Sequence, residues 1–290
     1  MDIKYEGTVY RPPSEARSWI FQATIGCSHN KCSFCSMYKD KEFRIRDVDE
    51  IIDEIENVSK MYPEVNRVFI ADGDALIIKT RDLERIIQKI KENFKYCSRI
   101  GIYSSPNSIH LKSLEDLILL RDKGLDIAYL GLESGSDKVL DYVNKGDTKS
   151  GIINAGKKLK EAGIKVSITV ISGLGGADLY KEHAIETADA INEINPDYLG
   201  LLTLMIEPGT KLYDDVKSGE FVLLTPQEIA LETLMILENI NSPGTVFRSN
   251  HASNYIPLKG TLNEDKDYLI RQLKRAIDEG NYVDEAYRRL

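Results

Sequence analysis

Three cysteines lie within nine residues of this sequence, at Cys27, Cys32 and Cys35. Thiolates are soft ligands that suit zinc or iron–sulfur clusters, and a short loop brings three of them together at a small cost in entropy. A structural zinc site is closed by four protein ligands, whereas a [4Fe–4S] cluster held by three cysteines leaves one iron open to another molecule. His29 is a candidate fourth ligand for zinc. The loop alone therefore leaves two interpretations, an iron–sulfur cluster or a zinc site.

The elements around this loop alternate between two patterns. Short apolar runs predict six β-strands, and amphipathic helical patterns follow them. The predicted strands are Trp19 to Ile25, Arg67 to Ala71, Arg99 to Tyr103, Ile127 to Leu132, Lys165 to Ile171 and Tyr198 to Leu204. The strands read as buried runs, which predicts parallel pairing with helical crossovers and an α/β barrel that is partly or wholly closed.

Helix ends are marked by residues that cap helices. We expect helices to begin at Asp47, which forms a capping box with Glu50, at Thr80, at Ser113, at Thr148 and at Asp178. Gly124 and Gly163 are expected to end the third and fourth helices. In such folds the chemistry lies in the loops after the C-terminal ends of the strands, and the three cysteines directly follow the first strand.

The alternation stops after Pro208. We expect a helix from Thr225-Pro226, a short extended piece over Val246 to His251, and a last helix over Glu264 to Asp278 that ends at Gly280. The predicted organisation is a partial-barrel core over residues 1–215 and a helical C-terminal extension over residues 216–290, packed on the same domain.

Composition narrows the choice of partners and compartment. The 46 acidic side chains outnumber the 38 basic ones, and the formal charge of -8 argues against a general affinity for nucleic acid or anionic lipid. No apolar run approaches the roughly 18 residues of a membrane helix, and Met1 to Tyr10 has no hydrophobic stretch typical of a signal peptide. Four cysteines in so long a chain do not form a disulfide framework. We therefore expect a cytoplasmic protein.

Taken together, the cysteine loop and the segments after the later strands resemble the radical S-adenosylmethionine superfamily. The resemblance extends from about Trp19 to the segment around Tyr213 and includes Phe34, the aromatic residue before the last cysteine. Most members space the cysteines C-x3-C-x2-C, whereas this chain has C-x4-C-x2-C. The later segments are similar to the branch that contains coproporphyrinogen dehydrogenase-like, methylthiotransferase-like and cobalamin-associated members.

The resemblance implies roles for three further segments. Asp72, Gly73 and Asp74 stand where the family binds the amino group of the methionine portion of the cofactor, although Asp-Gly is also ordinary in turns. Glu133, with Ser134 beside it, would accept hydrogen bonds from the ribose hydroxyls; the alternative is that Glu133 and Ser136 cap the following helix. Ile171, Ser172 and Gly173 resemble the adenine-contacting segment, although a glycine-rich turn would look the same.

Other polar residues have no such assignment. Ser104, Ser105 and Asn107 follow the third strand. Arg248, Asn250, His251 and Asn254 form a polar stretch in the tail, for which a hydrogen-bonded corner is slightly favoured over substrate contact. Cys97 is expected to be an inert, partly buried thiol.

The resemblance implies an enzyme whose [4Fe–4S] cluster, bound by Cys27, Cys32 and Cys35, cleaves S-adenosylmethionine reductively to a 5′-deoxyadenosyl radical. That radical would abstract hydrogen from a substrate. Reduced ferredoxin or flavodoxin is the implied electron donor, and we expect a small-molecule substrate, with no membrane or nucleic-acid partner. The alternative is a non-catalytic, zinc-stabilised α/β barrel that binds a ligand or partner.

Overall fold

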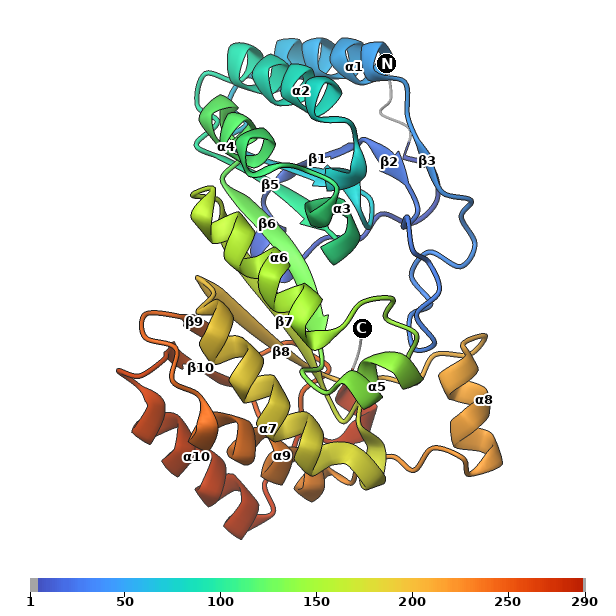
Figure 1. The fold of residues 1–290 in the computed structure, drawn as a ribbon, viewed down its shortest axis with the longest axis vertical. Helices are drawn as coiled ribbons and strands as arrows, with labels where there is room; N and C mark the ends of the chain where they lie inside the picture. The colour runs from blue at the N-terminus through green and yellow to red at the C-terminus, as the bar shows by residue number, and fades with distance from the viewer. Residues whose placement is uncertain (1–4, 289–290) are drawn as a thin grey trace. The chain divides into compact units, whose positions relative to one another are not determined.

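The structure is a computed structural model that describes residues 5–288; the first four residues of the segment considered above for a signal peptide lie outside the described residues. The chain divides into two compact units (Figure 1). The first unit consists of the residues up to Asn30, Met37–Leu130 and Lys157–Val166. The second unit consists of Lys31–Ser36, Gly131–Gly156 and the residues from Ser167 onward.

Parallel strands form the core of the first unit. They are β1 (Trp19–Gln22), β4 (Arg67–Ala71), β5 (Arg99–Ser104) and the beginning of β6 (Ile127–Glu133). Trp19 is in register with Val68, and Arg67 is in register with Arg99. Almost every side chain of β4 is buried, as expected for a strand covered on both faces. Two short antiparallel strands, β2 (Thr24–Ile25) and β3 (Arg44–Ile45), lie beside the cysteine loop in sequence.

Four helices follow these strands in the chain. They are α1 (Val48–Met61), α2 (Thr80–Asn93), α3 (Pro106–His110) and α4 (Leu114–Lys123). Ser113 and Asp116 form a reciprocal capping box at the start of α4, and Gly124 ends it in the left-handed conformation, which confirms both predicted ends. The buried residues of α2 are Leu83, Ile86, Ile87 and Ile90, which recur at helical spacing.

The second unit contains the later strands and most of the later helices. Its strands are the greater part of β7 (Lys165–Ser172), β8 (Tyr198–Thr203), β9 (Val246–Ser249) and β10 (Leu258–Thr261). β7, β8 and β9 are parallel, and β10 is antiparallel to β9. The helices after β6 are α5 (Asp137–Tyr142), α6 (Lys149–Glu161), α7 (Gly176–Ile194), α8 (Lys211–Ser218), α9 (Pro226–Asn239) and α10 (Lys266–Glu279). In Figure 1, α7 and α9 lie side by side.

In the eight-stranded sheet the strand order is β1-β4-β5-β6-β7-β8-β9-β10, and its described pairings are parallel except that of β9 with β10. This confirms the predicted fold class, an α/β partial barrel of parallel strands. The C-terminal extension is not purely helical, because β9 and β10 continue the sheet. The predicted boundary between residues 215 and 216 stays a prediction.

Four local predictions need correction. The first predicted strand is two strands, because Thr24 and Ile25 pair with Arg44 and Ile45 rather than with β4. Asp47 accepts hydrogen bonds from the Asp49 and Glu50 backbone N–H groups, but no return bond from Glu50 completes a capping box among the described contacts. Thr80 is the first residue of α2 rather than its cap, and no described side chain caps that end. In addition, α7 begins at Gly176, two residues before Asp178.

No helix in residues 5–288 is both long enough and apolar enough to cross a membrane.

Candidate functional site

The turn after β4 is joined by hydrogen bonds to the start of the cysteine loop. The Gly26 N–H donates to Asp72 Oδ2 (3.1 Å), and the Gly73 N–H donates to the Gly26 carbonyl (3.1 Å). A Cβ atom on Gly73 would lie 3.0 Å from the Cβ of Cys27 and 2.5 Å from the ring of Tyr38. Only glycine therefore fits there, and the structure places the predicted turn directly against Cys27.

Both carboxylates of this turn already have partners within the first unit. Asp72 is fully buried, and its Oδ2 accepts hydrogen bonds from Lys41 Nζ and Gln22 Nε2, both at 2.9 Å. Asp74 accepts from the Ser28 hydroxyl (2.5 Å) and from the N–H (2.9 Å) and hydroxyl (2.7 Å) of Ser105. The Asp74 carboxylate thus serves to fasten the turn to neighbouring segments. Ser105, one of the unassigned polar residues after the third predicted strand, also caps α3.

The segment with the other two cysteines belongs to the second unit and is hydrogen-bonded within it. The Ser33 N–H donates to the Val143 carbonyl (2.9 Å), and the Leu212 N–H donates to the Ser33 carbonyl (3.0 Å). The chain around Cys32 and Cys35 is therefore fastened to the end of α5 and the start of α8. Phe34 and Ile171, both predicted site residues, pack against one apolar cluster formed by Val139, Val143, Leu174, Leu204, Leu212 and Phe221.

The three clustered cysteines differ from the fourth in exposure. Cys27, Cys32 and Cys35 are partly exposed, whereas Cys97 is buried, and no disulfide joins any of them in the described chain. Burial raises the pKa of the Cys97 thiol, which suits an inert side chain. Three accessible thiols are a donor set whose chemistry fits an iron–sulfur cluster. Within residues 5–288, no three or more His, Cys, Asp or Glu side chains gather in an arrangement that could hold a metal ion.

Glu133 ends β6 with an unusual backbone conformation. Its φ angle is +62°, in the left-handed region that residues other than glycine rarely adopt. Its carboxylate forms an ion pair with Lys145 Nζ at 3.0 Å, and both side chains are largely buried. A Cβ atom on Gly131 would lie 2.0 Å from Glu133 Oε1, so the glutamate folds back over a space that only glycine leaves open. Backbone outliers of this kind cluster at active sites, ligand-binding segments and switch regions.

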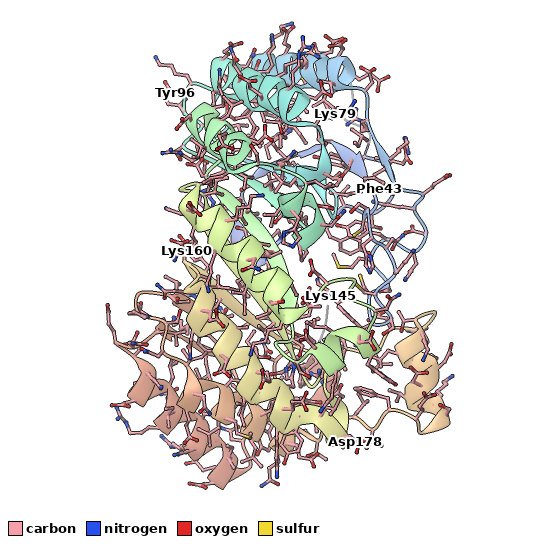
Figure 2. All side chains as sticks on the ribbon, viewed as in Figure 1. Phe43, Lys79, Tyr96, Lys145, Lys160 and Asp178 are labelled. Atoms are coloured by element: carbon pink, nitrogen blue, oxygen red, sulfur yellow. The ribbon has the colours of Figure 1, made fainter. Side chains whose placement is uncertain are left out.

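Lys145 is a site residue that the sequence did not identify. Figure 2 labels it in the chain between α5 and α6. Lys145 lies 12 positions after Glu133, and only the fold shows that its cation pairs with that carboxylate. Of the alternative capping roles, Ser136 does cap α5 through the Val139 N–H (3.3 Å), whereas the contact described for Glu133 is with Lys145.

The turn after β7 contacts α9, in the C-terminal part of the chain. Gly173 has a φ of +84°, and its N–H donates to Glu232 Oε1 at 2.8 Å. The Ser172 hydroxyl lies 3.5 Å from the hydroxyl of Thr233. Glu232 is on α9, and burial raises the pKa of its carboxyl to about 8. No local sequence signal pointed to this residue, because an acidic residue within a helix is usually exposed.

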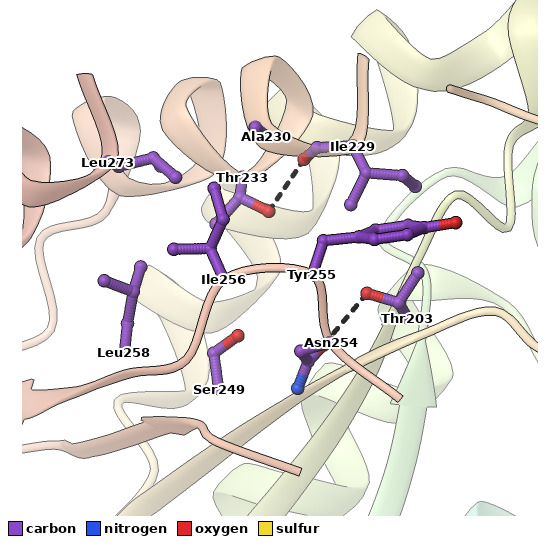
Figure 3. Close-up of a pocket in the computed structure, with 10 residues that line it drawn as sticks. All are labelled: Thr203, Ile229, Ala230, Thr233, Ser249, Asn254, Tyr255, Ile256, Leu258 and Leu273. Carbon is purple, nitrogen blue, oxygen red and sulfur yellow. Dashed lines mark hydrogen bonds between the residues drawn. The ribbon is translucent and has the colours of Figure 1, made fainter. Parts of the chain in front are cut away.

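The polar stretch in the tail forms a hydrogen-bonded corner. The Thr203 hydroxyl donates to Asn254 Oδ1 (2.9 Å; Figure 3), and Asn254 Nδ2 donates to the Leu201 carbonyl (2.9 Å). The cavity beside them measures about 10 Å³, which is room for roughly one water molecule. These contacts tie the stretch to β8, as the favoured structural interpretation predicted for Asn254.

Comparison with known families identifies the superfamily to which this chain belongs. The model of the Radical SAM superfamily matches residues 21–191, more than half of the sequence, and includes the cysteine loop and the turns after β4, β6 and β7. The chain belongs to the radical SAM superfamily. This membership confirms the predicted cofactors, a [4Fe–4S] cluster and S-adenosylmethionine.

Curated relatives are about one quarter identical to this chain over the aligned residues. The anaerobic magnesium-protoporphyrin IX monomethyl ester cyclase of Rubrivivax gelatinosus is 27% identical over 96% of this chain and 50% of its own length. The heme chaperone HemW of Bacillus subtilis is 23% identical over 73% of this chain and 56% of its own length. The chain thus spans about half the length of these relatives.

Solved structures support the fold. Coproporphyrinogen III oxidase (HemN) from Escherichia coli, a radical SAM enzyme, has a TM-score of 0.55 and 21% identity over 74% of this chain and 51% of its own. Methylornithine synthase (PylB) has a TM-score of 0.54 and 17% identity over 88% of this chain and 68% of its own.

Proposed function

We propose that this chain is a radical S-adenosylmethionine enzyme acting on a small-molecule substrate, with Cys27, Cys32 and Cys35 as the ligands of its [4Fe–4S] cluster. The observation that carries the proposal is the set of three partly exposed thiols after the first strand, in a chain of this superfamily. The extra residue between Cys27 and Cys32 lengthens the loop but keeps all three donors.

When bound, the cofactors supply the chemistry: one electron from a ferredoxin- or flavodoxin-like donor splits S-adenosylmethionine into methionine and a 5′-deoxyadenosyl radical, which takes a hydrogen atom from the substrate. The protein's part is to bind the nucleoside in one orientation and to keep water away. Glu133 accepts hydrogen bonds from the ribose hydroxyls, and Lys145 fixes its carboxylate. The turns at Gly73 and Gly173 approach the methionine and adenine portions through their backbones.

The names of the relatives suggest which substrates to test first. The cyclase, HemW and HemN are all named for tetrapyrroles. We therefore infer that a tetrapyrrole is a suitable first probe, to be tried as magnesium-protoporphyrin monomethyl ester, coproporphyrinogen III and haem. Accelerated formation of 5′-deoxyadenosine with one of them would identify a substrate, whereas tight haem binding without turnover would favour a carrier role.

The central test replaces one ligand. After anaerobic reconstitution, we expect about four irons per chain, broad absorbance at about 400 nm and formation of 5′-deoxyadenosine under reduction. Cys32→Ala should lose all three, because two thiolates do not hold the cluster. Cys97→Ala is the matched control and should keep them, because Cys97 is buried and precedes β5, far from the cysteine loop in sequence.

Two outcomes would contradict the proposal. One is iron and turnover retained in Cys32→Ala, which would refute the ligand assignment. The other is a colourless protein that keeps about one zinc ion per chain, which would favour the zinc-stabilised barrel.

A further inference from the structure

Two titratable side chains are fully buried against each other in the second unit, away from the predicted ligands. His183 lies on α7 and Glu232 on α9, and His183 Nε2 is 3.7 Å from Glu232 Oε1. Burial lowers the pKa of His183 to about 4 and raises that of Glu232 to about 8. Near neutral pH both are therefore uncharged, and the contact is not an ion pair.

His183 reaches the turn after β6. Its Nδ1 lies 2.8 Å from the Ser134 hydroxyl, which also accepts a hydrogen bond from the Ser136 N–H (3.0 Å). A Cβ atom on Gly175 would lie 3.1 Å from the Cβ of His183. The glycine therefore allows His183 to pack closely against the backbone at position 175. Ser134 directly follows Glu133, and a movement of this histidine would therefore move the segment that aims the Glu133 carboxylate.

Glu232 reaches the turn after β7. Its Oε1 accepts the Gly173 N–H at 2.8 Å, and the neighbouring Thr233 approaches the Ser172 hydroxyl. Gly173 is held with a positive φ, so this hydrogen bond fixes a backbone conformation that is otherwise one of several open to glycine. The two buried side chains thus connect the two turns to which the nucleoside of the cofactor is assigned.

Packing alone does not account for this pair. His183 Nε2 and Glu232 Oε2 have no hydrogen-bond partner in the described structure. A buried polar group without a hydrogen-bond partner destabilises the fold, whereas apolar side chains of similar size would not. Because neither side chain is exposed, neither is placed to contact a substrate directly.

We propose that His183 and Glu232 are positioning residues, which hold the turns after β6 and β7 in the spacing that binds the nucleoside portion of S-adenosylmethionine. The inference rests on the proposed function and deepens it, since it assigns a role to residues outside the binding surface. They act through Ser134 and Gly173.

The test compares Glu232→Leu with Glu232→Gln in the reconstituted holoprotein. Glutamine keeps an oxygen acceptor for the Gly173 N–H, and leucine fills the space without one. Calorimetric titration measures the affinity for S-adenosylhomocysteine and 5′-deoxyadenosine, while iron content and the visible spectrum report on the cluster. We expect Glu232→Leu to weaken both affinities about tenfold with the cluster intact, as for loss of one buried hydrogen bond, and Glu232→Gln to stay within about threefold. Glu238→Leu, on the exposed side of α9, is the control and should bind like wild type.

Wild-type affinity in Glu232→Leu, or equal losses in the leucine and glutamine variants, would overturn the positioning role. If Glu232→Leu does not fold, His183→Asn against His183→Leu makes the same comparison from the other end, with the same expected difference. A wild-type holoprotein that binds neither nucleoside would instead overturn the proposed function, so the two failures are distinguishable.

Discussion

At the scale of single residues, Glu133 is held in one orientation by its surroundings. Its left-handed backbone, its ion pair with Lys145 and the open space above Gly131 together determine where its carboxylate lies. Backbone strain of this kind costs about 1–3 kcal/mol, and the surrounding contacts must offset it. The pre-set orientation reduces the entropy that ligand binding would otherwise lose.

A methyl group at position 131 tests this orientation. Gly131→Ala places its Cβ where Glu133 Oε1 now lies and forces the carboxylate to turn away. We expect affinity for S-adenosylhomocysteine to fall about tenfold or more, as for a lost charge-assisted hydrogen bond, with iron content unchanged. Calorimetric titration measures it. Gly200→Ala on β8 is the matched control, because its Cβ would meet nothing closer than 3.8 Å. Equal binding by both variants would remove Glu133 from the site.

The buried carboxyl of Glu232 also predicts how stability depends on pH. Its pKa rises from 4.5 in the unfolded chain to about 8 in the fold, so the folded state keeps a proton that the unfolded state releases. Stability therefore falls as pH rises through this window. His183 acts in the opposite direction, because its pKa falls from 6.5 to about 4 and stability is lost as pH drops. Between pH 6.5 and 8 only the Glu232 effect remains.

Replacement of the titrating group isolates this effect. As the pH rises from 6.5 to 8, an interval of about 1.5 pH units, the free energy of unfolding of the wild type should fall by up to about 2 kcal/mol relative to that of Glu232→Gln. Guanidinium chloride unfolding at the two pH values measures it, and Glu238→Gln should behave like wild type. Parallel pH dependences in Glu232→Gln and wild type would show that Glu232 is ionised in the fold at neutral pH.

At the scale of elements, α7 positions the turn after β6. A Cβ atom on Gly135 would lie 2.1 Å from the Glu186 carbonyl, so the helix backbone and the turn are in direct contact. The Gly135 N–H also donates to the Thr187 hydroxyl at 2.8 Å. His183 lies one turn earlier on the same helix. A single helix therefore contacts this turn both through its backbone and through its buried imidazole.

Helix ends in the first unit provide a test of local sequence rules. Ser113→Ala removes a reciprocal capping box and should lower the free energy of unfolding by about 1 kcal/mol. Thr80→Ala should cost less than about 0.5 kcal/mol, because Thr80 lies inside α2 and is not its cap. Chemical denaturation of the two variants under identical conditions measures the difference. A larger loss for Thr80→Ala would mean that the sequence-based cap was right.

At the scale of the whole molecule, the net charge predicts weak binding to nucleic acid. The formal charge of -8 repels a phosphate backbone. We expect this chain to bind unmodified transfer RNA no more tightly than about 10 µM at about 0.15 M salt, as measured by filter binding. The comparison matters because a tRNA uridine(34) acetyltransferase of Methanocaldococcus jannaschii is 26% identical over 53% of this chain. Submicromolar affinity would redirect the search for a substrate to RNA.

The sequence by itself determined the class of protein. Apolar runs alternating with capped helices predicted the parallel sheet, and the three thiols limited the metal site to zinc or an iron–sulfur cluster, because hydrophobic periodicity and ligand chemistry are local properties of a chain. The family followed from the resemblance of the cysteine loop and the later segments to the radical SAM superfamily. The same local rules located most helix ends. They missed β10, which is four residues long, and the division of the first strand, because pairing between short strands depends on neighbours rather than on the strand itself.

Only the tertiary structure decided which polar groups support the predicted site. Lys145 reaches Glu133 across 12 positions in the sequence, and Glu232 reaches Gly173 across 59. His183 and Glu232 meet because α7 and α9 pack together, and nothing in either helix alone indicates that a charged residue type will be buried. Burial is a property of the assembled fold, and it is burial that changes the pKa values of these side chains and makes their few contacts matter.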